Sequence, residues 1–148
     1  MGIRALNYDT DSRIVQKHVA AGTASTVCTP VDMQNFEGVR FVVPVTTHKN
    51  GGTVTVTFEE ASATSATFNT LTGTSLLFTG TTVADSKILL ADIYRPKDRY
   101  VRATVVTATQ QSSFGPVVAE LYGSRKLKTT NSTAYGVADT DQQSSPST

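Results

Sequence analysis

Two short runs with an apolar residue at every second position are the feature that most constrains this fold. The runs are Val39–Val45 and Thr53–Phe58, where valines and phenylalanines occupy every second position. A period of two places these apolar side chains on one face of a β-strand. Asn50-Gly51, a strong signal for a tight turn, lies between the runs. The pattern therefore predicts a hairpin of two strands that each bury a single face.

A second pair of apolar runs flanks a short basic connection. The runs are Lys87–Tyr94 and Tyr100–Ala108, both rich in Ile, Leu, Val or Tyr, and the connection is Arg95–Arg99. The proline and the aspartate of this connection favour a turn, and the runs are shorter than typical helices. We therefore predict a central hairpin whose two strands belong to the core of an antiparallel sheet.

The remaining segments carry weaker signals. Ser12–Ala20 could form an edge strand, and Val117–Tyr122, after Gly-Pro, is predicted as the last strand. Pro30–Phe36 resembles a capped helical turn, because threonine, proline and aspartate suit the start of a helix. Residues 59–86 are rich in small and polar residues and fit either short strands or a long loop, and Thr109–Phe114 is expected to be a polar connection.

The length and the composition favour one all-β domain. The chain has 148 residues, and charged residues make up only 17% of it, with threonine and serine in their place. About seven to nine predicted strands at regular spacing indicate an antiparallel β-sandwich or a small barrel. We expect an extended N-terminal arm with a possible edge strand at 1–22, the sandwich at 23–126 and a Ser/Thr-rich polar C-terminal tail at 127–148.

The charge balance and the single cysteine exclude several classes of protein. Thirteen basic and twelve acidic residues leave a net charge of +1, so no general field would attract nucleic acid or an anionic membrane. Cys28 alone cannot form an internal disulfide or a cysteine-based zinc site, and we interpret it as a small buried hydrophobic residue. We see no signal peptide and no membrane span, and we expect synthesis in a cytoplasm.

No catalytic constellation stands out. The two histidines, His18 and His48, fall on a predicted edge strand and in a predicted hairpin loop, where we expect both to be exposed to solvent. Cys28 has no histidine near it in the sequence that could activate the thiol. We therefore predict that the protein is not an enzyme and that it uses no metal and no cofactor.

The candidate site is a cluster of four basic residues around the central turn, Arg95, Lys97, Arg99 and Arg102. One interpretation is a solvated turn of little energetic consequence. The other is a protein interface at which these residues meet acidic groups of a neighbouring subunit. We do not expect nucleic acid as the partner, because only Tyr94 and Tyr100 interleave with the cluster and tyrosines on strands usually pack.

Three segments follow one another in a recognisable order. They are Pro30–Val39 leading into Phe41–Val43, Leu90–Pro96 followed by Arg99–Arg102, and a closing strand like Val117–Tyr122 before a polar tail. Together these segments resemble small structural proteins encoded among the head genes of tailed bacteriophages. The resemblance covers most of the folded part in the same order. It implies a virion structural protein.

Within the virion, the resemblance implies a capsid decoration or cement protein located on the capsid surface. Its partner would be the major capsid protein, and it would form a homo-oligomer, with a trimer as the expected state. A head–tail connector or tail-tube component is the alternative within the same particle. A carbohydrate-binding attachment module is a further alternative, which the absence of tryptophan disfavours.

Overall fold

The structure, a computed structural model, describes residues 10–80 and 86–124. The described residues form strands and no helix, so none of them forms a helix long and apolar enough to cross a membrane. The ten strands are β1 (Asp11–Gln16), β2 (Val19–Val27), β3 (Val31–Asp32), β4 (Gly38–His48), β5 (Thr53–Ala61), β6 (Asn69–Thr70), β7 (Leu76–Thr79), β8 (Lys87–Tyr94), β9 (Tyr100–Phe114) and β10 (Val117–Tyr122).

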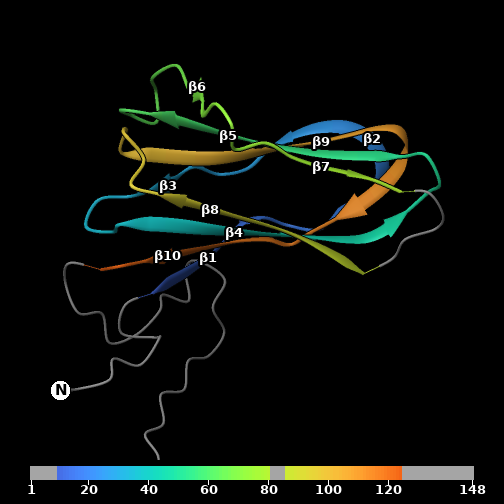
Figure 1. Cartoon of the computed structure of the whole chain (residues 1–148), viewed down its shortest axis with the longest axis horizontal. Coiled ribbons are helices and arrows are strands. Elements are labelled where there is room, and N and C mark those ends of the chain that lie inside the picture. The colour runs from blue at the N-terminus through green and yellow to red at the C-terminus, as the bar shows by residue number, and fades with distance from the viewer. Residues whose placement is uncertain (1–9, 81–85, 125–148) are drawn as a thin grey trace, which may run out of the picture.

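The strands form two antiparallel layers, and the predicted all-β sandwich is confirmed (Figure 1). The first layer has the order β1-β10-β4-β8. In the second layer β9 lies between β5 and the pair β2 and β3, and β5 continues to β6 and β7. The end of β9, Ser112–Phe114, leaves β5 and pairs with the end of β4. Thr109, with a φ of 67°, lies at this bend and connects the layers.

The core lies between the layers and uses the apolar positions that the alternation singled out. In β4 the odd-numbered residues from Val39 to Val45 have no exposed surface, and their neighbours in sequence point outward. Val54, Val56 and Phe58 meet them from β5, and the rings of Phe41 and Phe58 lie 5.3 Å apart. Close packing of such side chains is the main source of stability in a sandwich.

Both predicted hairpins are wrong in their pairing, although their strands are present. β4 pairs with β8, β9 and β10, and β5 pairs with β6, β7 and β9, so the turn at Asn50-Gly51 carries the chain from one layer to the other. The basic turn does the same between β8 and β9. Each of these strands buries one apolar face, and strands that face each other across a core satisfy this pattern as well as paired strands do.

Three local predictions also need correction. Pro30–Phe36 forms no helix, because Val31 and Asp32 pair with β9 as β3 and the Met33 amide bonds to Arg99. Thr109–Phe114 is not a connection but the end of β9. β8 is an edge strand, since β4 is the one strand with which it pairs in the described chain.

Other local predictions hold or fall outside the described residues. The sequence left short strands and a long loop open for 59–86, and the described part of this range contains the short strands β6 and β7. The possible edge strand of the N-terminal arm is present as β1, which pairs with β10. The predicted polar tail at 127–148 lies outside the described residues.

Candidate interaction surface

The basic turn lies at one end of the sandwich, where the chain passes from β8 to β9. Its first residue, Arg95, has a φ of 50°, and its amide donates to the carbonyl oxygen of Glu37 at 2.7 Å. The Arg95 side chain is 68% exposed, and its guanidinium lies 3.6 Å from the Glu37 carboxylate. It also lies 5.2 Å from the centre of the Tyr94 ring. Arg95 is therefore largely available to a partner, because so exposed a pair is worth little.

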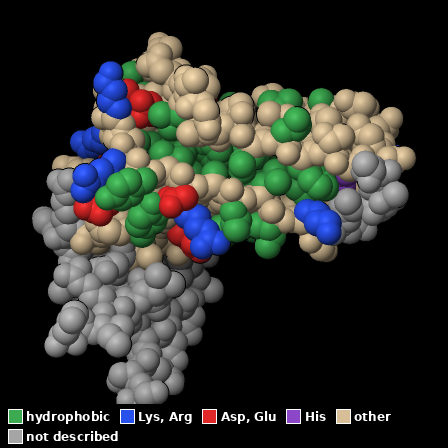
Figure 2. Space-filling model, in the orientation of Figure 1, with side chains coloured by type: hydrophobic (Ala, Val, Ile, Leu, Met, Phe, Trp, Pro, Cys, Tyr) green, Lys and Arg blue, Asp and Glu red, His purple; other side chains and the backbone are tan. Residues whose placement is uncertain are grey.

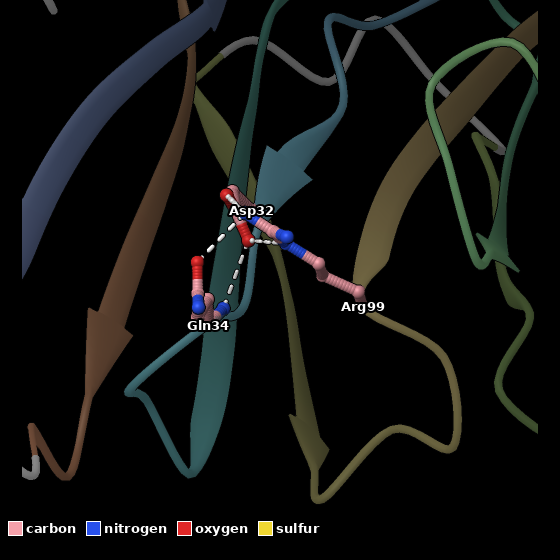
Figure 3. Close-up of polar contacts among 3 residues, drawn as sticks. All are labelled: Asp32, Gln34 and Arg99. Atoms are coloured by element: carbon pink, nitrogen blue, oxygen red, sulfur yellow. Dashed lines mark hydrogen bonds and ion pairs between the residues drawn. The ribbon is translucent and has the colours of Figure 1, made fainter.

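Arg99 forms a two-pronged ion pair with Asp32 (Figure 3). Its Nε and Nη2 donate to the two carboxylate oxygens of Asp32 at 2.8 and 2.7 Å, and Nη2 also donates to the Gln34 side-chain oxygen at 2.7 Å. The Gln34 amide donates to the same carboxylate at 2.9 Å. The hydrogen bond from Arg99 lowers the pKa of Asp32, and the same bond raises the pKa of Arg99. Arg99 therefore fastens the turn to β3.

Arg102 is also held inside its own chain. It stands opposite Glu59 in the pairing of β9 with β5, and its Nε donates to the Glu59 carboxylate at 2.6 Å. The hydroxyl of Thr104 donates to the same oxygen at 3.4 Å. The guanidinium lies 3.9 Å from the centre of the Phe68 ring, which is cation–π geometry. Arg102 therefore braces β9, β5 and the loop after β5.

Lys97 contributes to the turn through its backbone rather than its side chain. The amides of Lys97 and Asp98 donate to one carboxylate oxygen of Glu60 at 2.9 and 3.1 Å. The Lys97 side chain is exposed, and no ion pair of its ammonium occurs among residues 10–80 and 86–124. Lys97 is the basic residue of the cluster that the described part of the chain leaves uncompensated.

A hollow of about 760 Å³ opens beside the turn. Its walls are the loop 33–37 on one side and the turn 95–99 on the other, and Met33 within it is buried. Three of the four candidate residues, Arg95, Lys97 and Arg99, line the hollow together with the acidic Glu37 and Asp98. Since Arg99 is already paired with Asp32, Arg95 and Lys97 are the basic groups of this wall that can meet an acidic side chain of a partner. Arg102 does not belong to this wall.

The outward face of the first layer is a second candidate interaction surface. Registered pairs align Ile14 with Val118, Val118 with Val42, and Val42 with Leu90. These four residues form an apolar row across β1, β10, β4 and β8, with Ile14 42% and Leu90 47% exposed. We call these four residues the apolar row. Figure 2 shows the side of the molecule along which β7 and β8 run, with hydrophobic side chains there and basic residues at the end that carries the turn.

The apolar row was absent from the sequence interpretation. Val42 and Val118 lie on strands that were predicted, but in the sequence each is only a single valine at an outward position, which is common on a strand. The row exists because the register of three strand pairs brings the four residues together. No sequence signal specifies those registers.

The histidines and the cysteine form no site. His18 is exposed as expected, but the prediction that His48 is exposed is wrong, because this residue ends β4 and is 1% exposed. Its Nδ1 bonds to the Ser112 hydroxyl at 2.7 Å, and its Nε2 accepts from the Gly80 amide at 3.0 Å. Cys28 is buried, as predicted, and burial raises the pKa of its thiol to about 12. Such a thiol is a poor nucleophile.

The described part of the chain contains no group of three His, Cys, Asp or Glu residues placed to hold a metal ion. No family model matches the chain, and no curated protein matches it.

Proposed function

We propose that this protein is a non-enzymatic structural protein of a tailed-bacteriophage virion. It decorates and stabilises the capsid by binding the major capsid protein on the outer surface of the shell. The segments that resemble phage head proteins support this proposal through their positions. β8, β4 and β10 carry parts of all three and lie side by side in the first layer.

The observation that carries the proposal is the apolar row on the outward face of that layer. A contiguous apolar surface without polar groups arranged for chemistry suits a flat contact with another protein. The row is bordered by the charged residues Glu120, Arg40 and Asp92, which occupy one register position on neighbouring strands. Apolar area bordered by charges of both signs is the usual composition of a protein interface.

The hollow beside the basic turn adds a second contact of different chemistry. Arg95 and Lys97 are exposed there and can meet acidic groups of a capsid subunit. Arg99 holds the turn against β3 and Arg102 holds β9 against β5, since their acidic partners belong to the same chain. The four residues of the candidate interface thus divide into two that contact the partner and two that stabilise the fold around them.

Binding to capsid shells that lack the protein tests this function. The full chain is mixed with purified shells, bound protein is measured by co-sedimentation, and its position is determined by image reconstruction. We expect many copies spread over the shell. Ile14→Lys should reduce the bound amount about tenfold or more, because it places a charge in the apolar row. Leu77→Lys, an equally drastic change on β7 of the second layer, should bind normally.

Two results would contradict the proposal. Bound protein confined to one vertex would indicate a connector instead, and no binding to shells of the phage that encodes the chain would exclude decoration. Retained binding by Ile14→Lys would remove the apolar row from the interface.

A further inference from the structure

β8 is an unusually open sheet edge. All eight residues from Lys87 to Tyr94 pair without interruption with Val45 to Gly38 of β4. No strand pairs with its other side in the described chain. Because antiparallel pairing uses the backbone groups of alternate residues, about half of the β8 amides and carbonyls point away from β4. Such an edge is a template for another strand.

The other edges of the sandwich are interrupted or short. β1 has a register shift between Ile14 and Gln16, and β2 has two shifts along its pairing with β9. β6 has two residues and β7 has four. Bulges and short strands are the features by which proteins prevent unwanted edge pairing. β8 has neither a shift nor a proline, so its open edge contrasts with the other edges of the described strands.

The side chains of β8 fit a second β8 strand. Ile88 and Leu90 point outward and are 61% and 47% exposed, while Leu89 and Ala91 point toward the core. We propose that two copies of this chain pair antiparallel through β8 about a two-fold axis, so that their first layers join into one continuous sheet. The axis passes at Leu89, which places Ile88 opposite Leu90 of the second copy on both sides of the axis.

The charges of β8 disfavour the registers that lie further along the strand. An axis one residue further along, at Leu90, would place the carboxylate of Asp92 opposite Ile88. An axis at Ala91 would place Asp92 opposite Leu90 and Lys87 opposite Arg95, which repel each other. In the register centred on Leu89, Asp92 stands opposite Ser86 and Lys87 opposite Ala91. Leu89 then faces its own copy and Ile88 faces Leu90, and apolar cross-strand pairs of this kind are favourable.

This pair differs from the trimer that the resemblance implies, and it does not depend on the proposed function. A closed two-fold dimer uses the same surface on both copies. It leaves the outward face of the first layer, including Ile14, Val118 and Val42, exposed for another partner.

The mass of the full chain in solution tests the pair. We expect a dimer by analytical ultracentrifugation. Leu90→Lys should raise the dimer dissociation constant about a hundredfold or more, because the two-fold axis places one new lysine from each copy in the interface. Leu77→Lys, at the 68% exposed apolar residue of the neighbouring strand β7, is the matched control and should remain dimeric. Monomers at all concentrations, a trimer, or a dimer that Leu90→Lys does not weaken would overturn the proposal.

Cross-linking tests the register and remains decisive if Leu90→Lys fails to fold. Directly opposed residues of antiparallel strands have Cα atoms about 4.5–5.5 Å apart, a span that a disulfide bridges. Ile88→Cys mixed with Leu90→Cys should form a cross-linked heterodimer under mild oxidation, and neither variant alone should cross-link efficiently. Wild-type protein is the control, since Cys28 is 1% exposed. Efficient cross-linking of Leu90→Cys with itself would overturn the register, and no cross-link in the mixture would overturn the pair.

Discussion

At the scale of single residues, the four basic side chains of one short segment have different roles because their surroundings differ. Arg102 and Glu59 have side chains that are 25% and 21% exposed, and Arg102 also stacks on Phe68. Partial burial reduces the competition of water for both charges, so this pair should matter more than an exposed one. Lys97 lacks such surroundings.

Replacing Arg102 should therefore destabilise the fold, whereas replacing Lys97 should not. We expect Arg102→Ala to lower the free energy of unfolding by about 1–2 kcal/mol, through loss of a cross-strand pair and a cation–π contact. Arg102→Lys should recover part of this loss, because lysine keeps the charge but not the planar group. Lys97→Ala should change stability by less than about 0.5 kcal/mol. Urea unfolding measures all three, and equal losses for Arg102→Ala and Lys97→Ala would contradict this assignment.

Asp32 should make stability depend on pH in the acidic range. Its pKa is lowered in the folded state from an ordinary value of 3.8, first of all by the hydrogen bond from Arg99. The unfolded chain therefore binds the proton more readily, and the ion pair stabilises the fold fully above the ordinary value. That contribution is lost as the pH falls through the lowered folded value.

Asp32→Asn isolates this contribution, because asparagine can still accept from the Gln34 amide. We expect the variant to be less stable than the wild type at neutral pH. The two free energies of unfolding, measured in urea, should converge as the pH falls below the ordinary value. A difference that stays constant down to the lowest pH would show that the charge of Asp32 is not responsible.

Sequence could locate these residues but not their partners. The basic cluster is visible as a string of letters, yet Asp32 lies 67 positions from Arg99, and Glu59 lies 43 from Arg102. Such pairs follow from strand register, and a one-residue slip would remove them. His48 shows the same limit. Its position in a predicted hairpin loop led to the prediction that it is exposed. It is buried because Gly80 and Ser112, which bond to it, come from distant segments.

At the scale of elements, alternation predicted strands well and pairing poorly. The single buried faces of β4 and β5 are in the sequence, and so is the turn between them. Whether consecutive strands lie beside or opposite each other depends on what else pairs with them. Here β9 lies beside β5 and β8 lies beside β4, so both turns connect the layers. Turn signals mark where the chain reverses but not the layer that it enters.

Edges are the other element-level property that the sequence conceals. The apolar run of β8 predicted a core strand, because buried and edge strands of this composition read alike. Only the observed pairing shows that Ile88 and Leu90 are exposed. A hydrophobic edge strand is consistent with a protein that assembles, which is the behaviour that both proposals require.

At the scale of the whole molecule, β9 is the element that joins the sandwich. It pairs with β2, β3 and β5 in the second layer and reaches β4 in the first through Ser112–Phe114. Val101, Ala103 and Val105 on this strand have no exposed surface. No local opening can release the middle of β9 without separating several strands. By contrast, β7 is a four-residue strand that pairs with β5 alone among the described strands.

Amide hydrogen exchange of the full chain should therefore be slower in β9 than in β7. We expect the protected amides of Val101–Val105 to exchange only through global unfolding, with opening free energies equal to the value from urea. The amides of β7 should exchange through local opening, at clearly lower free energies, because edge strands detach first. The substitution Arg102→Ala lowers the free energy of global unfolding. It should therefore lower the opening free energy of the β9 amides by the same amount and leave the exchange rates of the β7 amides nearly unchanged. Equal exchange in the two strands would contradict this difference, and β9 amides that do not respond to the substitution would show that β9 opens without global unfolding.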